Sequence, residues 1–160
     1  MLVKVQRPGI AEAVERDLLV LAELARGVEA RTAWGADYHV AELTGEFADR
    51  LREELDFRLE ARNATEIAAS LDGAGEVHVP AVHRELSTAR VLVMEWLDGV
   101  SAREVDRIDA MGLDRARLAE TLLRCALRQM LVEGRFHADP HPGNVLVLEG
   151  GRLGLIDFGA

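Results

Sequence analysis

The sequence contains a single cysteine and no long run of apolar residues. Cys125 has no second cysteine in the chain to pair with, so an internal disulfide is excluded. Apolar runs such as 18–22 and 91–94 are far shorter than the ~20 residues that a helix needs to span a bilayer. The chain also does not open on the basic and apolar segments of a secretory signal peptide. We therefore expect a reducing, cytoplasmic setting and no transmembrane helix.

Positive charge is also scarce. The 160 residues include 19 Lys and Arg against 28 Asp and Glu, which gives a formal net charge of −9 at pH 7. Because no broad basic field is available to attract phosphate backbones, we do not expect nucleic acid as a partner. The hydrophobic share of 49% and the charged share of 29% are typical of one soluble globular domain, and we find no internal repeat or low-complexity segment.

The first half of the sequence has mainly helical periodicity. A short strand at 2–5 precedes residues 10–31, where apolar positions recur every three or four residues, as in an amphipathic helix. A polar and aromatic patch at 34–39 is expected to separate this helix from a longer one. The longer helix is predicted to begin near Leu43 and to end near Gly73.

Beyond residue 75 the pattern changes to short strands, and then to one further strong helix. We expect a hairpin from 77–82 and 90–97, followed by a short helix that begins with a capping box of Ser101 and Glu104. The next helix is predicted to be capped by Asp114, to have an apolar stripe over 118–131 and to end at Gly134. Two strands are expected after it, at 145–148 and 153–156.

Three polar residues near the end of the chain have the spacing of a phosphoryl-transfer site. Asp139 and Asn144 lie in "FHADPHPGNVLV" (136–147), and Asp157 lies in "LIDFGA" at the end of an apolar strand. In phosphoryl transfer, one carboxylate orients or deprotonates the acceptor, and an amide oxygen with a second carboxylate holds magnesium on the phosphates. We therefore expect Asp139 in the first role, and Asn144 and Asp157 as the metal ligands.

A zinc site is the competing interpretation of the same segment. His137 and His141 have the i, i+4 spacing of a helical metal pair, but Pro140 and Pro142 disfavour a helix there. We expect His137 instead to pack or to form hydrogen bonds beneath the loop.

The strings "HADPHPGN" and "DFG" match the protein-kinase pattern H-R-D-x-x-x-x-N followed by D-F-G. Together with "VKVQRPGI" (3–10) and "EELDFRLEARNA" (53–64), the chain resembles the UbiB/AarF family of atypical kinases, which are linked to ubiquinone and other isoprenoid-lipid metabolism. The resemblance implies an α+β fold, namely the two-lobe fold of protein kinases, and it implies ATP and Mg²⁺ as cofactors.

The resemblance also implies roles for residues in the first half of the chain. Lys4 would pair with the phosphates of the nucleotide and bond to Glu60, and the helix at 10–31 would be the long insertion that precedes this glutamate. Glu54 and Asp56 correspond to the E-x-D signature of the family. That signature is expected to be regulatory, because it restrains the kinase fold by meeting an N-terminal K-x-G-Q motif.

In "VLVMEWLDG", the resemblance to kinase hinges places Met94 at the gatekeeper position. The backbone groups of Glu95 and Leu97 would then contact the adenine.

The sequence contains neither K-x-G-Q nor the alanine-rich nucleotide loop, and it includes no activation segment after D-F-G. We therefore expect a partial kinase-like domain, truncated at both ends. Residues 1–97 would be part of the small lobe with its helical insertion and hinge, and residues 98–160 would begin the large lobe with the catalytic loop.

Two other functions compete with an ATP-dependent kinase or ATPase of the UbiB type. An aminoglycoside-phosphotransferase-like small-molecule kinase also carries H-x-D-x-H-x-x-N and a later I-D-F or I-D-W, although "KVQRPG" and "EELDF" favour the first family. A truncated, non-catalytic nucleotide-binding fragment is the third interpretation. The expected partners are ATP and an unidentified small or lipid-linked substrate, with peripheral membrane association of the full-length protein.

Overall fold

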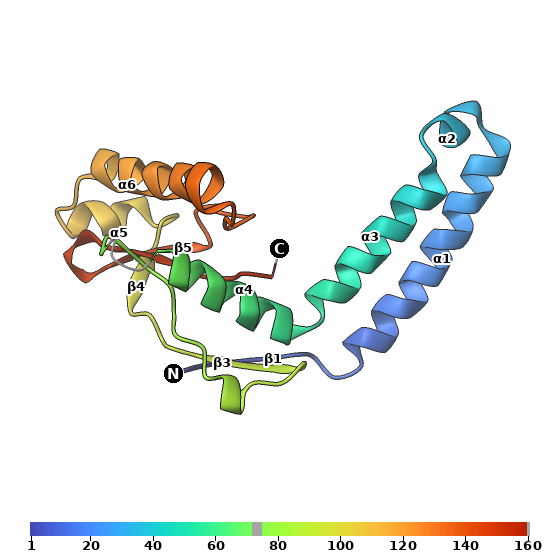
Figure 1. The fold of residues 1–160 in the computed structure, drawn as a ribbon. Helices are drawn as coiled ribbons and strands as arrows, with labels where there is room; N and C mark the ends of the chain where they lie inside the picture. Colours follow the sequence, from blue (N-terminus) through green and yellow to red (C-terminus); the bar gives the residue numbers. More distant parts are fainter. Residues whose placement is uncertain (72–74, 160) are drawn as a thin grey trace. The chain divides into compact units, whose positions relative to one another are not determined.

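The protein has an α+β fold, as predicted, in which one part is purely helical and the other combines small sheets with helices (Figure 1). The structure, a computed structural model, describes residues 1–71 and 75–159. The chain divides into two compact units. Residues 5–56 form the helical unit, and residues 1–4 together with the chain from Phe57 onward form the catalytic unit. Each unit is described by itself below.

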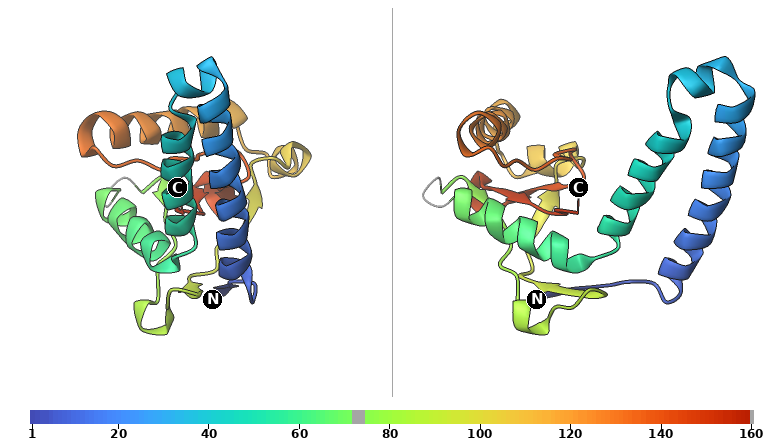
Figure 2. Two further views of the ribbon diagram at one scale, coloured as in Figure 1. Left: turned by 90° about the vertical axis from the view of Figure 1, so that its right-hand side faces the viewer. Right: turned by 45° about the vertical axis from the view of Figure 1, so that its right-hand side comes forward.

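The helical unit is a hairpin of two long helices. Helix α1 spans Ile10–Arg31, as predicted, and α3 spans Val40–Glu54. The two helices run side by side, and α2 (Ala33–Asp37) joins their far ends (Figure 2). Small and medium apolar side chains are buried along this pair, namely Leu18, Ala25 and Ala48.

Helix α2 corrects the expectation that 34–39 is only an irregular separator. The side chain of Thr32 accepts a hydrogen bond from the amide of Gly35 at 3.1 Å and so caps this short helix. A Cβ atom at Gly35 would lie 2.7 Å from the carbonyl oxygen of Val28. The absence of a side chain at Gly35 therefore lets the chain turn closely at the end of α1.

The single long helix predicted from Leu43 is two helices, α3 and α4 (Phe57–Ser70). Helix α3 ends because the amides of Leu55 and Asp56 bond to carbonyls only three residues back, at 3.2 and 3.0 Å. The amide of Phe57 then bonds to the carbonyl of Ala89 at 3.1 Å instead of continuing the helix. A long-range contact thus overrides the local periodicity. The predicted end at Gly73 lies outside the described residues.

Within its described residues, the catalytic unit contains two sheets. Strand β1 (Leu2–Val5) pairs with β3 (Val91–Met94). The second sheet has the order β2-β6-β5-β4, formed by Val77–His78, Leu153–Leu155, Val145–Leu148 and Gly99–Ser101. Strand β2 runs parallel to β6, and the other pairs are antiparallel. The strands at 145–148 and 153–156 were therefore predicted well.

The hairpin predicted from 77–82 and 90–97 is wrong. Strand β2 joins the four-stranded sheet and β3 joins β1, so the two strands do not pair with each other. The segments contact each other after β2, through the isolated bridge between Val82 and Met94 and the hydrogen bond from the Glu95 amide to the Ala81 carbonyl. A turn of 3₁₀ helix at Arg84–Leu86 lies between them. Strand propensity identified the segments, but pairing depends on partners distant in sequence.

Helices α5 (Val105–Ala110) and α6 (Arg115–Arg128) complete the unit. The predicted cap is present, because the Asp114 carboxylate accepts a hydrogen bond from the Ala116 amide at 2.8 Å. Helix α6 continues into a π-helical turn, Gln129–Glu133, which Gly134 ends with a φ of 66°. The capping box predicted ahead of α5 forms only in part. The Glu104 carboxylate accepts a hydrogen bond from the Ser101 amide at 3.3 Å, but α5 begins only after Glu104.

One core cluster joins the four-stranded sheet to helices α4, α5 and α6. Its members are Ala64, Ile67, Leu71, Val79, Ile108, Cys125, Val145, Val147, Leu153, Leu155 and Phe158. Burial raises the pKa of the Cys125 thiol, and the positive charge of Arg128 lowers it by a smaller amount, so the pKa is raised overall. None of the helices in the described ranges combines the length and apolar character needed to cross a membrane.

Candidate active site

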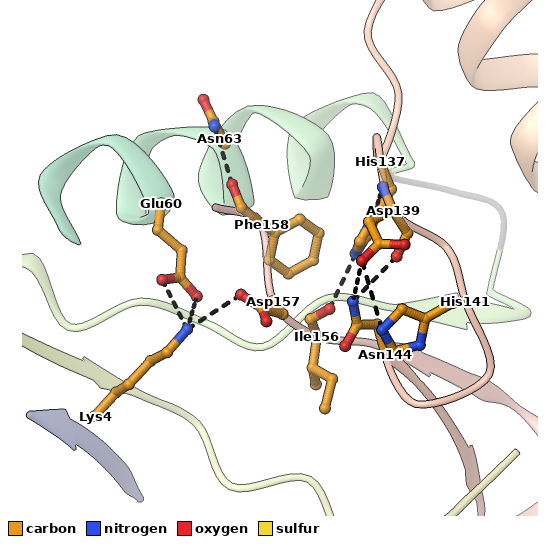
Figure 3. A network of polar contacts seen from close by, with 10 residues as sticks. All are labelled: Lys4, Glu60, Asn63, His137, Asp139, His141, Asn144, Ile156, Asp157 and Phe158. Atoms are coloured by element: carbon orange, nitrogen blue, oxygen red, sulfur yellow. Dashed lines mark hydrogen bonds and ion pairs between the residues drawn. The ribbon is translucent and has the colours of Figure 1, made fainter. Parts of the chain in front are cut away.

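A lysine and two carboxylates from three distant segments meet in the catalytic unit (Figure 3). The Nζ atom of Lys4, on β1, lies 2.9 Å from both carboxylate oxygens of Glu60 on α4. It also lies 3.1 Å from Oδ1 of Asp157, just beyond β6, and 5.4 Å from the centre of the Phe57 ring. The predicted contact between Lys4 and Glu60 is confirmed.

The environment keeps Lys4 charged. Burial by itself would lower the pKa of Lys4, but the hydrogen bonds and negative charges of Glu60 and Asp157 outweigh it and raise the pKa above 10.5. Glu60 is only 3% exposed, whereas the Lys4 side chain is 39% exposed. A buried carboxylate therefore holds a cation whose other side is open to a ligand.

The predicted catalytic loop follows the π-helical turn and leads into β5. The Nδ2 atom of Asn144 donates to the carbonyl oxygen of Asp139 at 3.1 Å and lies 3.4 Å from its Oδ2. The carbonyl of Asn144 accepts from the amide of Ile156 at 2.9 Å, because the ends of β5 and β6 are paired. This pairing places Asn144 beside the residue that precedes Asp157.

His137 braces this loop, as expected from its sequence context. Its Nε2 atom lies 3.0 Å from the carbonyl oxygen of Ile156, and its Nδ1 lies 3.2 Å from the amide nitrogen of Asp139. Because the amide can only donate, Nδ1 must accept, and the ring proton is on Nε2. The backbone amide of His137 donates in turn to Oε1 of the buried Gln129 at 3.1 Å.

The zinc alternative finds no support in the geometry. His141 uses Nδ1 to accept from the amide of Gly143 at 2.8 Å, while both nitrogens of His137 are engaged with the backbone. Across the residues that the structure describes, no group of three or more His, Cys, Asp or Glu side chains could hold a metal ion.

Magnesium fits a different arrangement. Asn144 and Asp157 offer an amide oxygen and a carboxylate, which are the hard oxygen ligands that Mg²⁺ prefers. Magnesium in phosphoryl-transfer sites takes one or two protein ligands and completes its shell with phosphate oxygens and water. The Asp157 side chain is 52% exposed, so it can face such a ligand.

The predicted hinge residues lie at the end of β3. Met94 and Leu97 are buried. The Glu95 amide donates to the carbonyl of Ala81 at 2.8 Å, so Glu95 would have only its carbonyl to offer to a base. Burial by itself would raise the pKa of Glu95, but hydrogen bonds from the Ala81 amide and His78, and the charge of Arg152, lower it overall.

Glu54 and Asp56 belong to the helical unit, at the end of α3. Glu54 is exposed and Asp56 is half-buried, with its amide bonded to the carbonyl of Glu53 at 3.0 Å. Their regulatory role stays a prediction, as do the catalytic and binding roles of the other site residues.

Sequence reasoning missed two side chains near the site. The Nδ2 atom of Asn63, on α4, donates to the carbonyl oxygen of Phe158 at 3.0 Å. Gln129 supports His137 from within α6's continuation. The available signals were positional: Asn63 follows Glu60 by three residues on one helix, and Gln129 is a polar residue inside the apolar stripe at 118–131.

The family model described as the ABC1 atypical kinase-like domain matches residues 1–160. The chain belongs to this family. The match confirms the predicted resemblance and favours it over the aminoglycoside-phosphotransferase alternative. A relative named an aarF domain-containing protein kinase, from Arabidopsis thaliana, is 36% identical over 157 residues.

Two further relatives and one solved structure match nearly the whole chain. "Protein ACTIVITY OF BC1 COMPLEX KINASE 1, chloroplastic" of Arabidopsis thaliana is 37% identical, with 98% of this chain and 23% of the relative covered. The protein MT0675 of Mycobacterium tuberculosis is 38% identical, with 99% and 33% covered.

The solved structure is the Rv3197–erythromycin complex from Mycobacterium tuberculosis. It matches with a TM-score of 0.76 and 33% identity, over 99% of this chain and 39% of that one. This ABC1-family chain thus spans less than half the length of each of these relatives.

Proposed function

We propose that this ABC1-family chain forms part of the ATP site of an atypical kinase or ATPase that works with Mg²⁺. One observation carries the proposal. The ammonium group of Lys4 bonds to the carboxylates of both Glu60 and Asp157, so three segments far apart in sequence meet at one cation. Kinase sites use such a lysine to grip the phosphates and such an aspartate to hold the metal.

The residues divide the work of phosphoryl transfer. Glu60 orients Lys4, and the ammonium group of Lys4 contacts phosphate oxygens as they gain charge. Asp139 accepts the proton of the attacking hydroxyl or orients an attacking water. Asn144 and Asp157 would hold magnesium, which neutralises charge on the phosphates when bound.

Nucleotide binding can be measured on this protein through Trp96, which lies between the hinge residues Glu95 and Leu97. The chain has two tryptophans, so W34F leaves Trp96 as the sole reporter. In that background we expect ATP to change the fluorescence, and we expect magnesium to strengthen binding. D157N should abolish the magnesium effect, whereas the exposed D17N on α1 should leave it intact. Binding that ignores both magnesium and D157N would contradict the metal role.

Turnover distinguishes the enzyme from a non-catalytic nucleotide-binding module. Release of phosphate from ATP that requires magnesium and Asp139 supports the proposal. Tight binding with no turnover, in the longest protein that carries this chain, would instead favour the binding module.

The acceptor class rests on the resemblance alone. We propose a small-molecule or lipid-linked hydroxyl related to isoprenoid-quinone metabolism, in a full-length protein that associates peripherally with membranes. The test supplies γ-labelled ATP with a prenylated phenol in detergent micelles. Label in the lipid indicates a kinase, and label only in inorganic phosphate indicates an ATPase.

A further inference from the structure

The backbone at Asp157 adopts a conformation that a non-glycine residue rarely takes. Its φ angle is 65°, in the left-handed region. An L-residue there is disfavoured by roughly 1–2 kcal/mol, so neighbouring contacts must hold it in place. The question is which contacts do so.

Side-chain donors bond to the carbonyls on both sides of Asp157. His137 donates from Nε2 to Ile156 on one side, and Asn63 donates from Nδ2 to Phe158 on the other, each at 3.0 Å (Figure 3). The amide orientation of Asn63 is unambiguous, because a carbonyl oxygen can only accept. The first hydrogen bond therefore fixes the peptide unit that precedes Asp157, and the second fixes the peptide unit that follows Phe158, one residue further along the chain.

Both apolar packing and polar contacts join α4 to this segment, because Phe158 shares the core cluster with Ala64 and Ile67 of α4. A cavity of about 200 Å³ lies between them, lined on one side by Asn63, Glu66 and Ile67 and on the other by the residues at 135–138 and Phe158. Two polar contacts join its two sides: the hydrogen bond of Asn63 to Phe158, and one turn later the ion pair between Glu66 and Arg135.

Helix α4 thus reaches Asp157 by two routes. Glu60 acts through Lys4, whose Nζ bonds to the Asp157 carboxylate, and Asn63 acts through the backbone that follows Asp157. The first route ties the side chain of Asp157 to the phosphate-binding lysine. The second leaves that side chain free to turn toward a metal while its backbone stays fixed.

We propose that Asn63 is a positioning residue that holds the backbone of Asp157 in the conformation needed for metal binding. The inference rests on the proposed function, because it assigns Asp157 to the metal. Asn63 itself contacts neither nucleotide nor metal in this role.

Three substitutions separate the hydrogen bond from the volume of the side chain. N63L and N63D are close in size to asparagine, but neither donates to Phe158 at neutral pH. N63Q keeps an amide donor on a longer side chain. The exposed T65D on the same helix is the control, since it adds the charge of N63D without facing Phe158.

In the W34F background, we expect N63L and N63D to lower kcat for ATP hydrolysis and to raise the magnesium concentration needed for half-maximal nucleotide binding. Each effect should be roughly 10- to 100-fold, as for other residues that orient metal ligands. Binding of magnesium-free ATP should be unchanged, which also shows that the variants are folded. N63Q should recover most of the loss, and T65D should match the parent.

A readout without ligand tests the same contact. Hydrogen exchange of the segment 156–159 should be faster in N63L than in the parent protein, with exchange in β3 unchanged. If N63L and N63D match T65D in magnesium dependence and in exchange, the proposal is overturned.

Failure of the proposed function would look different. A parent protein that binds no nucleotide would remove the metal role of Asp157, and with it the reason for the proposal. A parent that binds magnesium nucleotide normally while N63L does so equally well would overturn only the role of Asn63.

Discussion

The helical unit and the catalytic unit are stabilised by different kinds of contact. In the helical unit, α1 packs mainly on α3 and on α2, and few side chains are buried. In the catalytic unit, one core cluster draws on two strands and three helices, and the central ion pairs join residues 56 and 153 positions apart in sequence. The predicted catalytic and metal-binding residues lie in the catalytic unit. The chemistry should therefore depend on non-local contacts, and changes to the helical hairpin should affect it less.

The sharpest test of this difference removes one carboxylate from each unit. In the longest protein that carries this chain, we expect D139N to lower ATP hydrolysis by about 10²- to 10⁴-fold, because it removes the group that accepts or orients the proton. D17N, an equivalent change on the exposed face of α1, should have no effect. Steady-state phosphate release measures both. Equal activity of the two variants would remove Asp139 from the mechanism.

Core truncations compare how the two units respond to a cavity. Leu92 on β3 is 0% exposed and Leu18 on α1 is 5% exposed. L92A should cost near the upper end of the usual range of about 2–5 kcal/mol, and L18A near the lower end, because two packed helices can close a gap more easily than a sheet can. Urea denaturation followed by circular dichroism compares them. A larger loss in L18A would reverse the ranking.

The ion pair of Lys4 and Glu60 should contribute to stability as well as to binding. K4M leaves a buried carboxylate without its cation, which should cost roughly 1–3 kcal/mol. The double variant K4M/E60L should recover part of this loss, because no buried charge is then left unpaired. Thermal melts of the two single variants and the double variant test the coupling; strictly additive effects would contradict it.

The ion pair has a defined pH dependence. Since the folded-state pKa of Lys4 is raised above 10.5, its contribution is fully present below 10.5 and is lost as the pH rises through the raised value. The difference in stability between the parent protein and K4M should therefore shrink in strongly alkaline solution, and should be constant near neutral pH.

The smallest effect is expected for an ion pair of the helical unit. Arg52 bonds to Glu15 at 2.7 Å on the surface, and this hydrogen bond holds the pKa of Glu15 below 4.5. A carboxyl with a lowered folded-state pKa stabilises the protein above 4.5, and the effect disappears as the pH falls through the lowered value. E15Q should thus shift the melting temperature slightly at pH 7, less in high salt, and not at acid pH. A salt-independent shift would mean that packing, not charge, is responsible.

Sequence patterns predicted those features that depend on neighbours along the chain. Helix α1 has the predicted bounds, Asp114 caps α6, and Lys4 meets Glu60 as the family resemblance implied. These succeed because helix periodicity and capping are local, and because the family motifs name both partners of the ion pair.

The errors arose where a distant partner decides the outcome. The break before α4 depends on a hydrogen bond between Phe57 and Ala89, and the pairing of β2 depends on β6, which lies more than seventy residues away. The contact of Asn63 with Phe158 joins residues 95 positions apart, and the place of Asn63 three residues after Glu60 does not identify this partner. The site was therefore predictable as a set of motifs but not as a network.

Cys125 allows the opening of the core of the catalytic unit to be followed over time. It is the only thiol in the chain, it is buried among the residues that carry the sheet, and burial raises its pKa. A disulfide reagent reacts with the thiolate, so labelling must wait until the core opens. When closing is fast, the labelling rate reports the free energy of that opening. The native Cys125 thus allows the opening of the catalytic unit to be measured without an engineered probe and without a substrate.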